Sequence, residues 1–266
     1  TMTEVEDLYR PYKQKRRTRG SIAREKGLEP LAEAIFAQDG RDPQALALEY
    51  IDSEKGVNTA EEALQGASDI IAENLSDDAD IRKALRQLVM RRGTFTCKAA
   101  EDAEEDGVYR LYYDFCQPIP RLLDHQILAI NRGEKEGILK PAVTLTGNEG
   151  SALVCRAALK PTAQVSAFVR TAAEDAYDRL IFPAIQREVR NELSDRAYAG
   201  AIANFALNLK PLLMQPPVKG FVTMGLDPGY RNGCKVAVVD ATGKVLDTAV
   251  VYPTFNERKK QEAITI

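Results

Sequence analysis

The sequence predicts a mainly α-helical fold, in which a multi-helix scaffold is followed by the first strands of an antiparallel sheet. Three observations lead to this prediction. Apolar side chains recur at helical spacing through most of residues 1 to 219. Pro216 and Pro217 then stop the last helix and mark the main domain boundary. Beyond them, apolar runs at 221–224, 234–239 and 244–252 are separated by turns, a pattern typical of an antiparallel meander.

The N-terminal part begins with two short predicted helices. Apolar residues within 28–36 follow helical spacing, and the stretch 40–43 interrupts them. Pro43 suits the first turn of the next helix, which we expect over 44–51.

Longer helices with clear start signals follow. Thr59 with an acid at Glu62 is typical of a helix cap, and the helix is expected to continue through residue 75. The acidic run 76–78 indicates another helix start, with an apolar stripe over 81–89 and an end at Gly93.

The middle of the chain is less regular. Residues 101 to 106 form an acidic run, which we expect to be a solvated helix face or a loop. The four aromatic residues within 109–115 would pack in the core if they lie on one stripe of a helix, and the alternative is stacking on bases. Residues 122–130 predict an amphipathic helix, and we expect its His125 to be structural.

Strand signals appear next. The stretch 138–145 is rich in β-branched residues, but Pro141 would suit only an edge strand. Residues 152–159 fit either its hairpin partner or a helix, and periodicity does not decide between them.

The strongest helical segment is 171–193, in which Pro183 is expected to produce a kink or a break. Ser194 is in a position to cap a following helix, whose apolar stripe runs from Ile202 to Leu213.

The composition excludes several classes of protein. Lys plus Arg is 36 and Asp plus Glu is 39, so the net charge is −3 and a nucleic-acid site would have to be a local patch. The four cysteines are scattered and His125 is the single histidine, so we expect free thiols and no zinc site, as in a reducing cytoplasm. With no signal peptide and no apolar run of membrane length, we expect a cytoplasmic location and no membrane partner.

One basic segment is a candidate nucleic-acid interface. Six cations fall within twelve residues that contain no acid, after a Tyr-Arg-Pro-Tyr sequence in which Pro11 suggests an extended approach. Such a cluster neutralises phosphates without reading the base sequence, and the two tyrosines could add stacking. The alternative is a solvated surface, or arginines paired with acids elsewhere in the chain. The candidate contact residues are Lys13, Lys15, Arg16, Arg17, Arg19 and Arg24.

Asp227 is a second candidate, for metal binding. It ends the first predicted strand of the meander, within Gly225-Leu226-Asp227-Pro228-Gly229, where RNase H-like nucleases place a metal-binding Asp. Two-metal nucleases need several carboxylates that converge on Mg²⁺, and neither Asp240 nor Glu257 is placed to join it. A phosphate loop shaped by Gly229 and Gly233 is a weaker alternative, and Asp-Pro-Gly is also an ordinary turn sequence.

Several segments together resemble the Tex family of bacterial transcription accessory proteins, and they occur in family order along nearly the whole chain. The segments that carry the resemblance are 6–19, 22–32, 67–73, 128–134, 178–183 and 225–235.

The resemblance implies a central helical scaffold leading into a YqgF-type, RNase H-like α/β domain. It implies a helical region over 1–93, a central scaffold with a possible short β-hairpin over 94–219, and the start of the YqgF-like domain over 220–266. It also implies that the chain is part of a longer protein, whose RNA affinity lies mostly in a C-terminal OB-fold domain. In the family the YqgF-like domain is thought degenerate as a nuclease, so Asp227 would be a remnant.

The expected function is therefore that of a non-enzymatic, nucleic-acid-associated transcription accessory factor. Its expected partners are RNA or DNA, with RNA polymerase or the ribosome as protein partners, and no cofactor is expected. Two alternatives stay open. One is a Mg²⁺-dependent RNase H-like nuclease with further carboxylates beyond residue 266, and the other is a scaffold that binds only protein.

Overall fold

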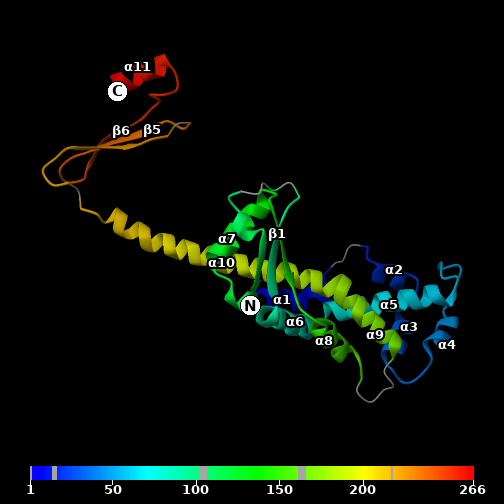
Figure 1. Ribbon diagram of the computed structural model, residues 1–266. Coiled ribbons are helices and arrows are strands. Elements are labelled where there is room, and N and C mark those ends of the chain that lie inside the picture. The colour runs from blue at the N-terminus through cyan, green and yellow to red at the C-terminus, as the bar shows by residue number, and fades with distance from the viewer. Residues whose placement is uncertain are drawn as a thin grey trace. The chain divides into compact units, whose positions relative to one another are not determined.

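The structure is a computed structural model that describes residues 2–13, 17–101, 103, 107–160, 166–216, 218–229 and 231–266 (Figure 1). The chain divides into two compact units, Thr1–Ala201 and Ile202–Ile266. The domain boundaries expected at residues 93 and 219 stay predictions.

The first unit is a helical scaffold that carries one small sheet. Its core is continuous from the N-terminal helices to the middle of the long helix α10. The helices that build it are α1 (Met2–Tyr9), α2 (Arg19–Glu25), α3 (Glu29–Phe36), α4 (Pro43–Leu48), α5 (Ala60–Asp77), α6 (Ala79–Arg92), α7 (Asp124–Lys135), α8 (Glu149–Ala158), α9 (Ala167–Asp175) and α10 (Phe182–Leu213), with 3-10 turns at Arg10–Tyr12, Arg110–Tyr112 and Ile119–Arg121.

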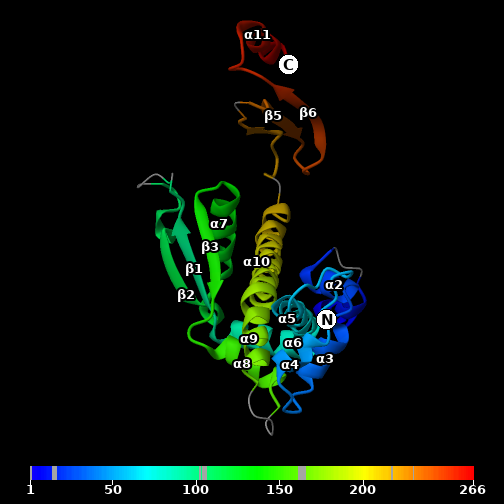
Figure 2. The ribbon, with the colours of Figure 1, turned by 90° about the vertical axis from the view of Figure 1, so that its right-hand side faces the viewer.

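Helix α5 lies at the centre of the N-terminal helices (Figure 2). Its apolar face, which includes Ile70 and Ile71, is buried against α2, α3, α4 and α9. Two glycines let α2 and α5 approach closely. A Cβ on Gly20 would lie 2.0 Å from an oxygen of Glu73, and a Cβ on Gly66 would lie 2.3 Å from Leu28.

The helix starts predicted at Thr59 and in the run 76–78 are confirmed. The Thr59 side chain accepts a hydrogen bond from the backbone N–H of Glu62, and the Glu62 carboxylate accepts one from Asn58. Asp78 caps α6 by accepting from the N–H of Ile81 at 2.9 Å, and Gly93 ends that helix. Each cap satisfies a backbone N–H that has no partner within its helix.

A three-stranded antiparallel sheet follows α6, and two of its strands were not predicted. The strand order is β2 (Asp114–Pro118), β1 (Thr94–Ala99) and β3 (Leu139–Thr144). Pro141 lies in β3, an edge strand, as expected. Phe95 of β1 is buried, with the guanidinium of Arg190 from α10 at 5.9 Å from its ring centre, so this face of the sheet contacts α10.

The strongest predicted helix forms, but Pro183 does not break it. Helix α9 continues through a π-helical segment, Ala176–Ile181, directly into α10. The wider turn lies just before the proline, where a regular α-helix would lose a hydrogen bond and clash with the ring. The cap expected at Ser194 is wrong, because α10 is continuous there. The Ser194 hydroxyl instead donates to the carbonyl of Arg190 and accepts from Asn131.

The structure corrects two other expectations, for Pro11 and for the aromatics of 109–115, and it settles the choice between strand and helix for 152–159. Pro11 lies in a 3-10 turn, so the approach to the basic segment is not extended. The aromatics of 109–115 do not form a helix stripe, since they lie in a 3-10 turn and in β2, although Tyr109 is buried in the core. Residues 152–158 are helical in α8, and Leu159 follows its end in an extended conformation. Most of the acidic run 101–106 lies outside the described residues.

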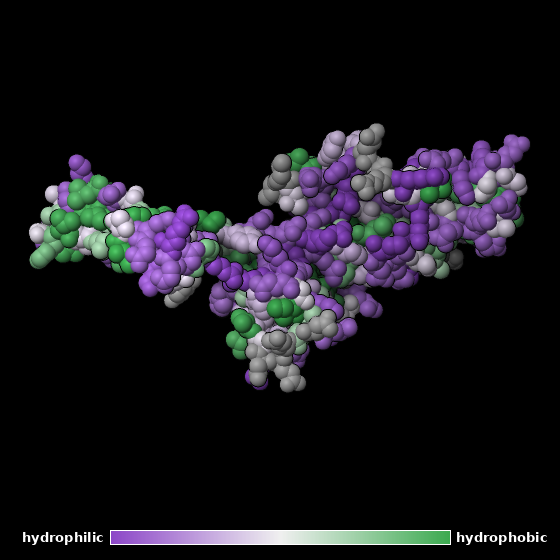
Figure 3. Space-filling model, turned by 90° about the horizontal axis from the view of Figure 1, so that it is seen from above, coloured by the Kyte–Doolittle hydropathy of each residue, from purple (hydrophilic) through white to green (hydrophobic). Residues whose placement is uncertain are grey.

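The second unit contains the predicted meander, with β4 (Thr223–Asp227), β5 (Cys234–Val239) and β6 (Val245–Val251) in that order, followed by α11 (Glu257–Thr265). Asp240 shapes the turn between β5 and β6 by accepting from the N–H groups of Thr242 and Lys244. Apolar side chains gather on this unit on the face that Figure 3 shows. The exposed apolar residues of its strands include Met224, Leu226, Val245, Leu246 and Val250.

Candidate nucleic-acid interface

An acidic stripe on α5 organises the surroundings of the basic segment. Asp69, Glu73 and Asp77 recur every four residues, so they lie on one face of the helix. All three are less than 10% exposed. Carboxylates buried to this extent need cationic or hydrogen-bonding partners, and the structure supplies them from three other elements.

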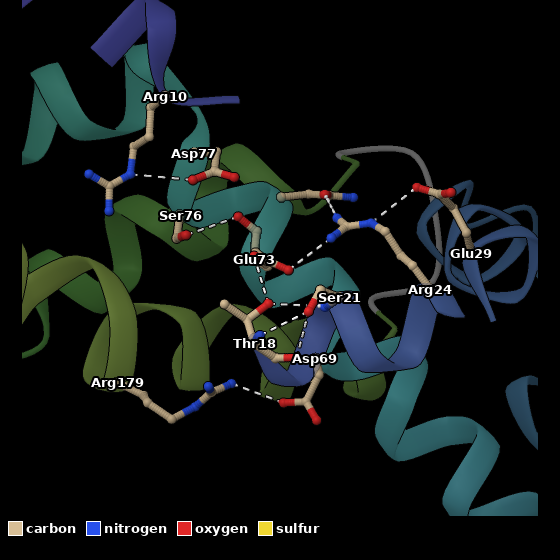
Figure 4. A network of polar contacts seen from close by, with 11 residues as sticks. Arg10, Thr18, Ser21, Arg24, Glu29, Asp69, Glu73, Ser76, Asp77 and Arg179 are labelled. Atoms are coloured by element: carbon tan, nitrogen blue, oxygen red, sulfur yellow. Dashed lines mark hydrogen bonds and ion pairs between the residues drawn. The ribbon is translucent and has the colours of Figure 1, made fainter. Parts of the chain in front are cut away.

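Arg24 is one of these partners. Its Nη1 lies 2.8 Å from Glu73 Oε2, its Nε lies 3.2 Å from Glu29, and its Nη2 donates to Asn74 at 2.6 Å (Figure 4). Thr18, which caps α2, donates to the other oxygen of Glu73 at 3.2 Å. Arg24 therefore holds α2 against α5, which is the alternative role that the sequence left open for an arginine of this segment.

Arg10 and Arg179 partner the other two acids. Arg10 Nε lies 3.3 Å from Asp77, and Arg179 Nη2 donates to Asp69 at 3.0 Å (Figure 4). Arg179 also donates a hydrogen bond to Asp175, one turn earlier. This hydrogen bond raises the pKa of Arg179, and its effect outweighs that of partial burial, which lowers the pKa. Among the described residues, each carboxylate of the acidic stripe thus has at least one arginine partner.

The remaining cations of the segment differ from Arg24. Lys13, Arg17 and Arg19 are exposed, and within the described ranges none of their side chains makes an ion pair or hydrogen bond. Lys15 and Arg16 lie outside the described residues. The three described side chains therefore keep their charge available for a partner.

The structure adds one cation that sequence reasoning missed. Arg187, on α10, lines the same groove as Lys13 and Arg19, and it is also exposed and unpaired among the described residues. It lies more than 160 positions along the chain from the basic segment, in a helix with mixed charges, so no local pattern marks it. Only the packing of α10 beside α5 brings it there.

A second ion network lies nearby and is fully structural. Arg82 of α6 is 0% exposed and bonds Asp7 of α1 at 2.7 Å and Glu188 of α10. Arg86 bonds the same two carboxylates at 2.7 Å each. Burial alone would lower the pKa of Arg86, but the hydrogen bonds to the two acids outweigh it and raise that pKa. Two cations and two anions thus connect three helices without a net charge.

Asp227 is exposed at the end of β4, opposite Lys235 of β5. Asp240 is engaged in its own turn, and Glu257 and Glu262 pair with lysines and an arginine of α11. The structure therefore brings no second of these carboxylates to Asp227. Across the described part of the chain, no group of three or more His, Cys, Asp or Glu side chains is arranged to hold a metal ion.

Of the helices in the described ranges, none combines the length and apolar character that crossing a bilayer requires.

Comparison with known proteins agrees with this architecture. Residues 38–205 match the family described as Tex central region-like, and residues 221–266 match the Tex protein YqgF-like domain. The two matches leave out residues 206–220, which include the last turns of α10.

Three relatives illustrate the similarity. The chain is 47% identical to the protein YdcI of Bacillus subtilis over 98% of this chain and 37% of the relative. It is 36% identical to the transcriptional accessory protein Tex of Neisseria gonorrhoeae over 94% of this chain and 34% of the relative. It is 32% identical to the human S1 RNA-binding domain-containing protein 1 over 95% of this chain and 27% of the relative.

The chain thus spans roughly a third of the length of the curated relatives that it matches. The first family match alone covers more than half of the chain, and the second follows it in the same order as the helical and strand-bearing segments. The chain belongs to the Tex family.

Proposed function

We propose that this chain is the nucleic-acid-contacting scaffold of a transcription accessory factor, and that the nucleic acid is RNA. The observation that carries the proposal is a set of exposed cations, Lys13, Arg17 and Arg19, that have no partner in the described ranges. They lie on a helical unit whose family includes a protein named for transcriptional accessory function. The name of the human relative, which refers to RNA binding, supports RNA over DNA.

The chemistry of the contact is neutralisation of phosphates. Unpaired lysine and arginine side chains replace the counterions of a nucleic-acid backbone, and this gives affinity without base specificity and with a strong salt dependence. The cations that pair with Asp69, Glu73 and Asp77 cannot do this without breaking structural bonds. The proposed contact set within the described residues therefore excludes Arg24.

The proposal includes no catalysis. Asp227 is a remnant that neither binds a functional metal ion nor cleaves a substrate, so the chain needs no cofactor. The test is incubation of the chain with labelled RNA and DNA in Mg²⁺ and Mn²⁺ buffers, beside an Asp227→Asn variant. We expect that any cleavage seen with the parent chain is also seen with the Asp227→Asn variant. Cleavage by the parent that is lost in the variant would support the nuclease alternative.

The proposed setting is the cytoplasm, with RNA polymerase or the ribosome as the protein partner. The four cysteines are free thiols, as a chain in a reducing compartment would keep them.

The binding proposal is tested by fluorescence anisotropy of labelled single-stranded RNA across a salt series. A variant with Lys13, Arg17 and Arg19 changed to Gln is compared with a control in which three exposed cations elsewhere on the unit, Lys98, Arg121 and Arg156, are changed in the same way. We expect the first variant to lose affinity and salt dependence and the control to retain both. Absence of binding by the parent at low salt, or equal losses in the two variants, would contradict the proposal.

A further inference from the structure

We infer that the groove between the basic segment, α5 and the start of α10 seats a segment of single-stranded nucleic acid, with backbone phosphates on Lys13, Arg19 and Arg187. This inference rests on the proposed function and deepens it, because it assigns the contact to one groove and adds a residue of α10.

The groove has a volume of about 500 Å³, and it is lined by the 3-10 turn that follows α1, the start of α2, α5, the π-helical segment and the start of α10. Its floor is the acidic stripe of α5, Asp69, Glu73 and Asp77. These acids form ion pairs with Arg179, Arg24 and Arg10, so they do not present free negative charge to a ligand.

The charge balance favours an anionic ligand. Five cationic and three acidic side chains line the groove, so the net charge of the lining is 5 − 3 = +2. Because the acids already have partners, the charge that remains free belongs to Lys13, Arg19 and Arg187, which come from two separate parts of the chain.

One wall of the groove is apolar. Leu180 of the π-helical segment and Pro183 and Ala184 at the start of α10 line the groove together with the cations. Leu180 and Pro183 are partly exposed, so they offer an apolar surface to a ribose or base while the cations take the phosphates. A base can reach such a wall only if it is unstacked and unpaired, so the groove suits a single strand and not a duplex.

The expected contribution of one contact follows from counterion release. For a single strand, each phosphate contact makes the negative slope of log affinity against log salt steeper by about 0.7. One contact therefore changes affinity about fivefold for each tenfold change in salt concentration.

The experiment uses the full chain with fluorescein-labelled U20 RNA from low to high salt. Arg187→Gln is compared with Arg156→Gln, an exposed and unpaired arginine of α8 that does not line the groove. We expect Arg187→Gln to weaken binding about fivefold at 0.1 M salt and to make the negative slope shallower by about 0.7, while Arg156→Gln changes neither. Thermal unfolding of each variant checks that the unit is intact.

Three outcomes would overturn the inference. Parent binding that Arg187→Gln leaves unchanged would remove the groove while leaving the proposed function standing. Equal effects of both variants would show that bulk charge alone matters. Absence of parent binding would remove the proposed function itself.

Competitors distinguish the class of ligand. Unlabelled U20 and dT20 are expected to displace the probe, because both carry the phosphate backbone. Better displacement by a duplex RNA, or equal displacement by poly-glutamate at the same charge concentration, would contradict a groove for single-stranded nucleic acid.

Discussion

Breaking the buried network of Arg82 and Arg86 should destabilise the helical unit strongly. Arg82→Met removes a guanidinium with no solvent exposure and leaves Asp7 and Glu188 to share Arg86 alone. At an effective dielectric constant of 20, the attraction across the 2.7 Å contact between Arg82 and Asp7 is about 6 kcal/mol before desolvation. Desolvation offsets part of this, and the expected loss of unfolding free energy is about 3–5 kcal/mol.

The matched variant removes the charge imbalance. In Arg82→Met/Asp7→Leu, the pair Arg86–Glu188 stays neutral and the space between α1 and α6 is filled by apolar atoms. We therefore expect the double variant to be more stable than Arg82→Met alone, since replacing a whole buried pair is often close to neutral. Urea unfolding followed by helical circular dichroism gives both values. If the double variant loses as much as the sum of the two single changes, the reasoning from charge balance is refuted.

Three further predictions concern packing and protonation. Gly20→Ala should cost about 1–3 kcal/mol in thermal or urea unfolding, because its Cβ would meet Glu73 at 2.0 Å, and an unchanged or higher stability would contradict the close α2–α5 contact. Burial raises the pKa of Cys97 to about 11 from 9.0, so its contribution to stability is complete below pH 9 and is lost as the pH rises through 11. Titration in urea should accordingly show a shallower alkaline loss for Cys97→Ala than for the parent. Hydrogen bonds from Thr242 lower the pKa of Asp240 below 3.8, so its turn should be intact above that pH and loosen as the pH falls through the lowered value. The amide signal of Thr242 in an acid titration by NMR measures this, and a turn that loosens above pH 5 would contradict it.

The sequence predicts the helices of the scaffold well because caps and apolar spacing are local signals. Thr59 and Asp78 illustrate this, since each helix starts where its cap does. Local signals fail where tertiary packing decides. Strand β1 does alternate, with Phe95 and Cys97 turned into the core, but it is only six residues long, and the Gly93 before it is explained by the end of α6.

Ser194 shows the opposite error, in which a local signal predicts a helix start that the structure does not have. A serine can cap a helix, but here its hydroxyl bonds within and between helices, and the apolar stripe of α10 continues past it. The capping pattern alone does not distinguish a helix start from a serine inside a long helix.

The candidate site was predictable only in part. The density of cations in residues 13–24 is visible in the sequence, but their division into paired and free side chains is not. Arg24 differs from the exposed cations because it bonds Glu73 and Asn74, which lie about fifty positions away in the sequence. Arg187 joins the groove through tertiary packing, and no spacing rule connects it to Lys13.

The salt dependence of RNA binding by the unaltered chain is the most direct measurement of phosphate contact. Four exposed cations of the proposed interface, Lys13, Arg17, Arg19 and Arg187, have no partner among the described residues, and they predict a slope of log affinity against log salt of about −3 for single-stranded RNA. A slope near this value supports a phosphate interface on the helical unit. Undetectable binding at low salt, or a slope shallower than about −1, would contradict it.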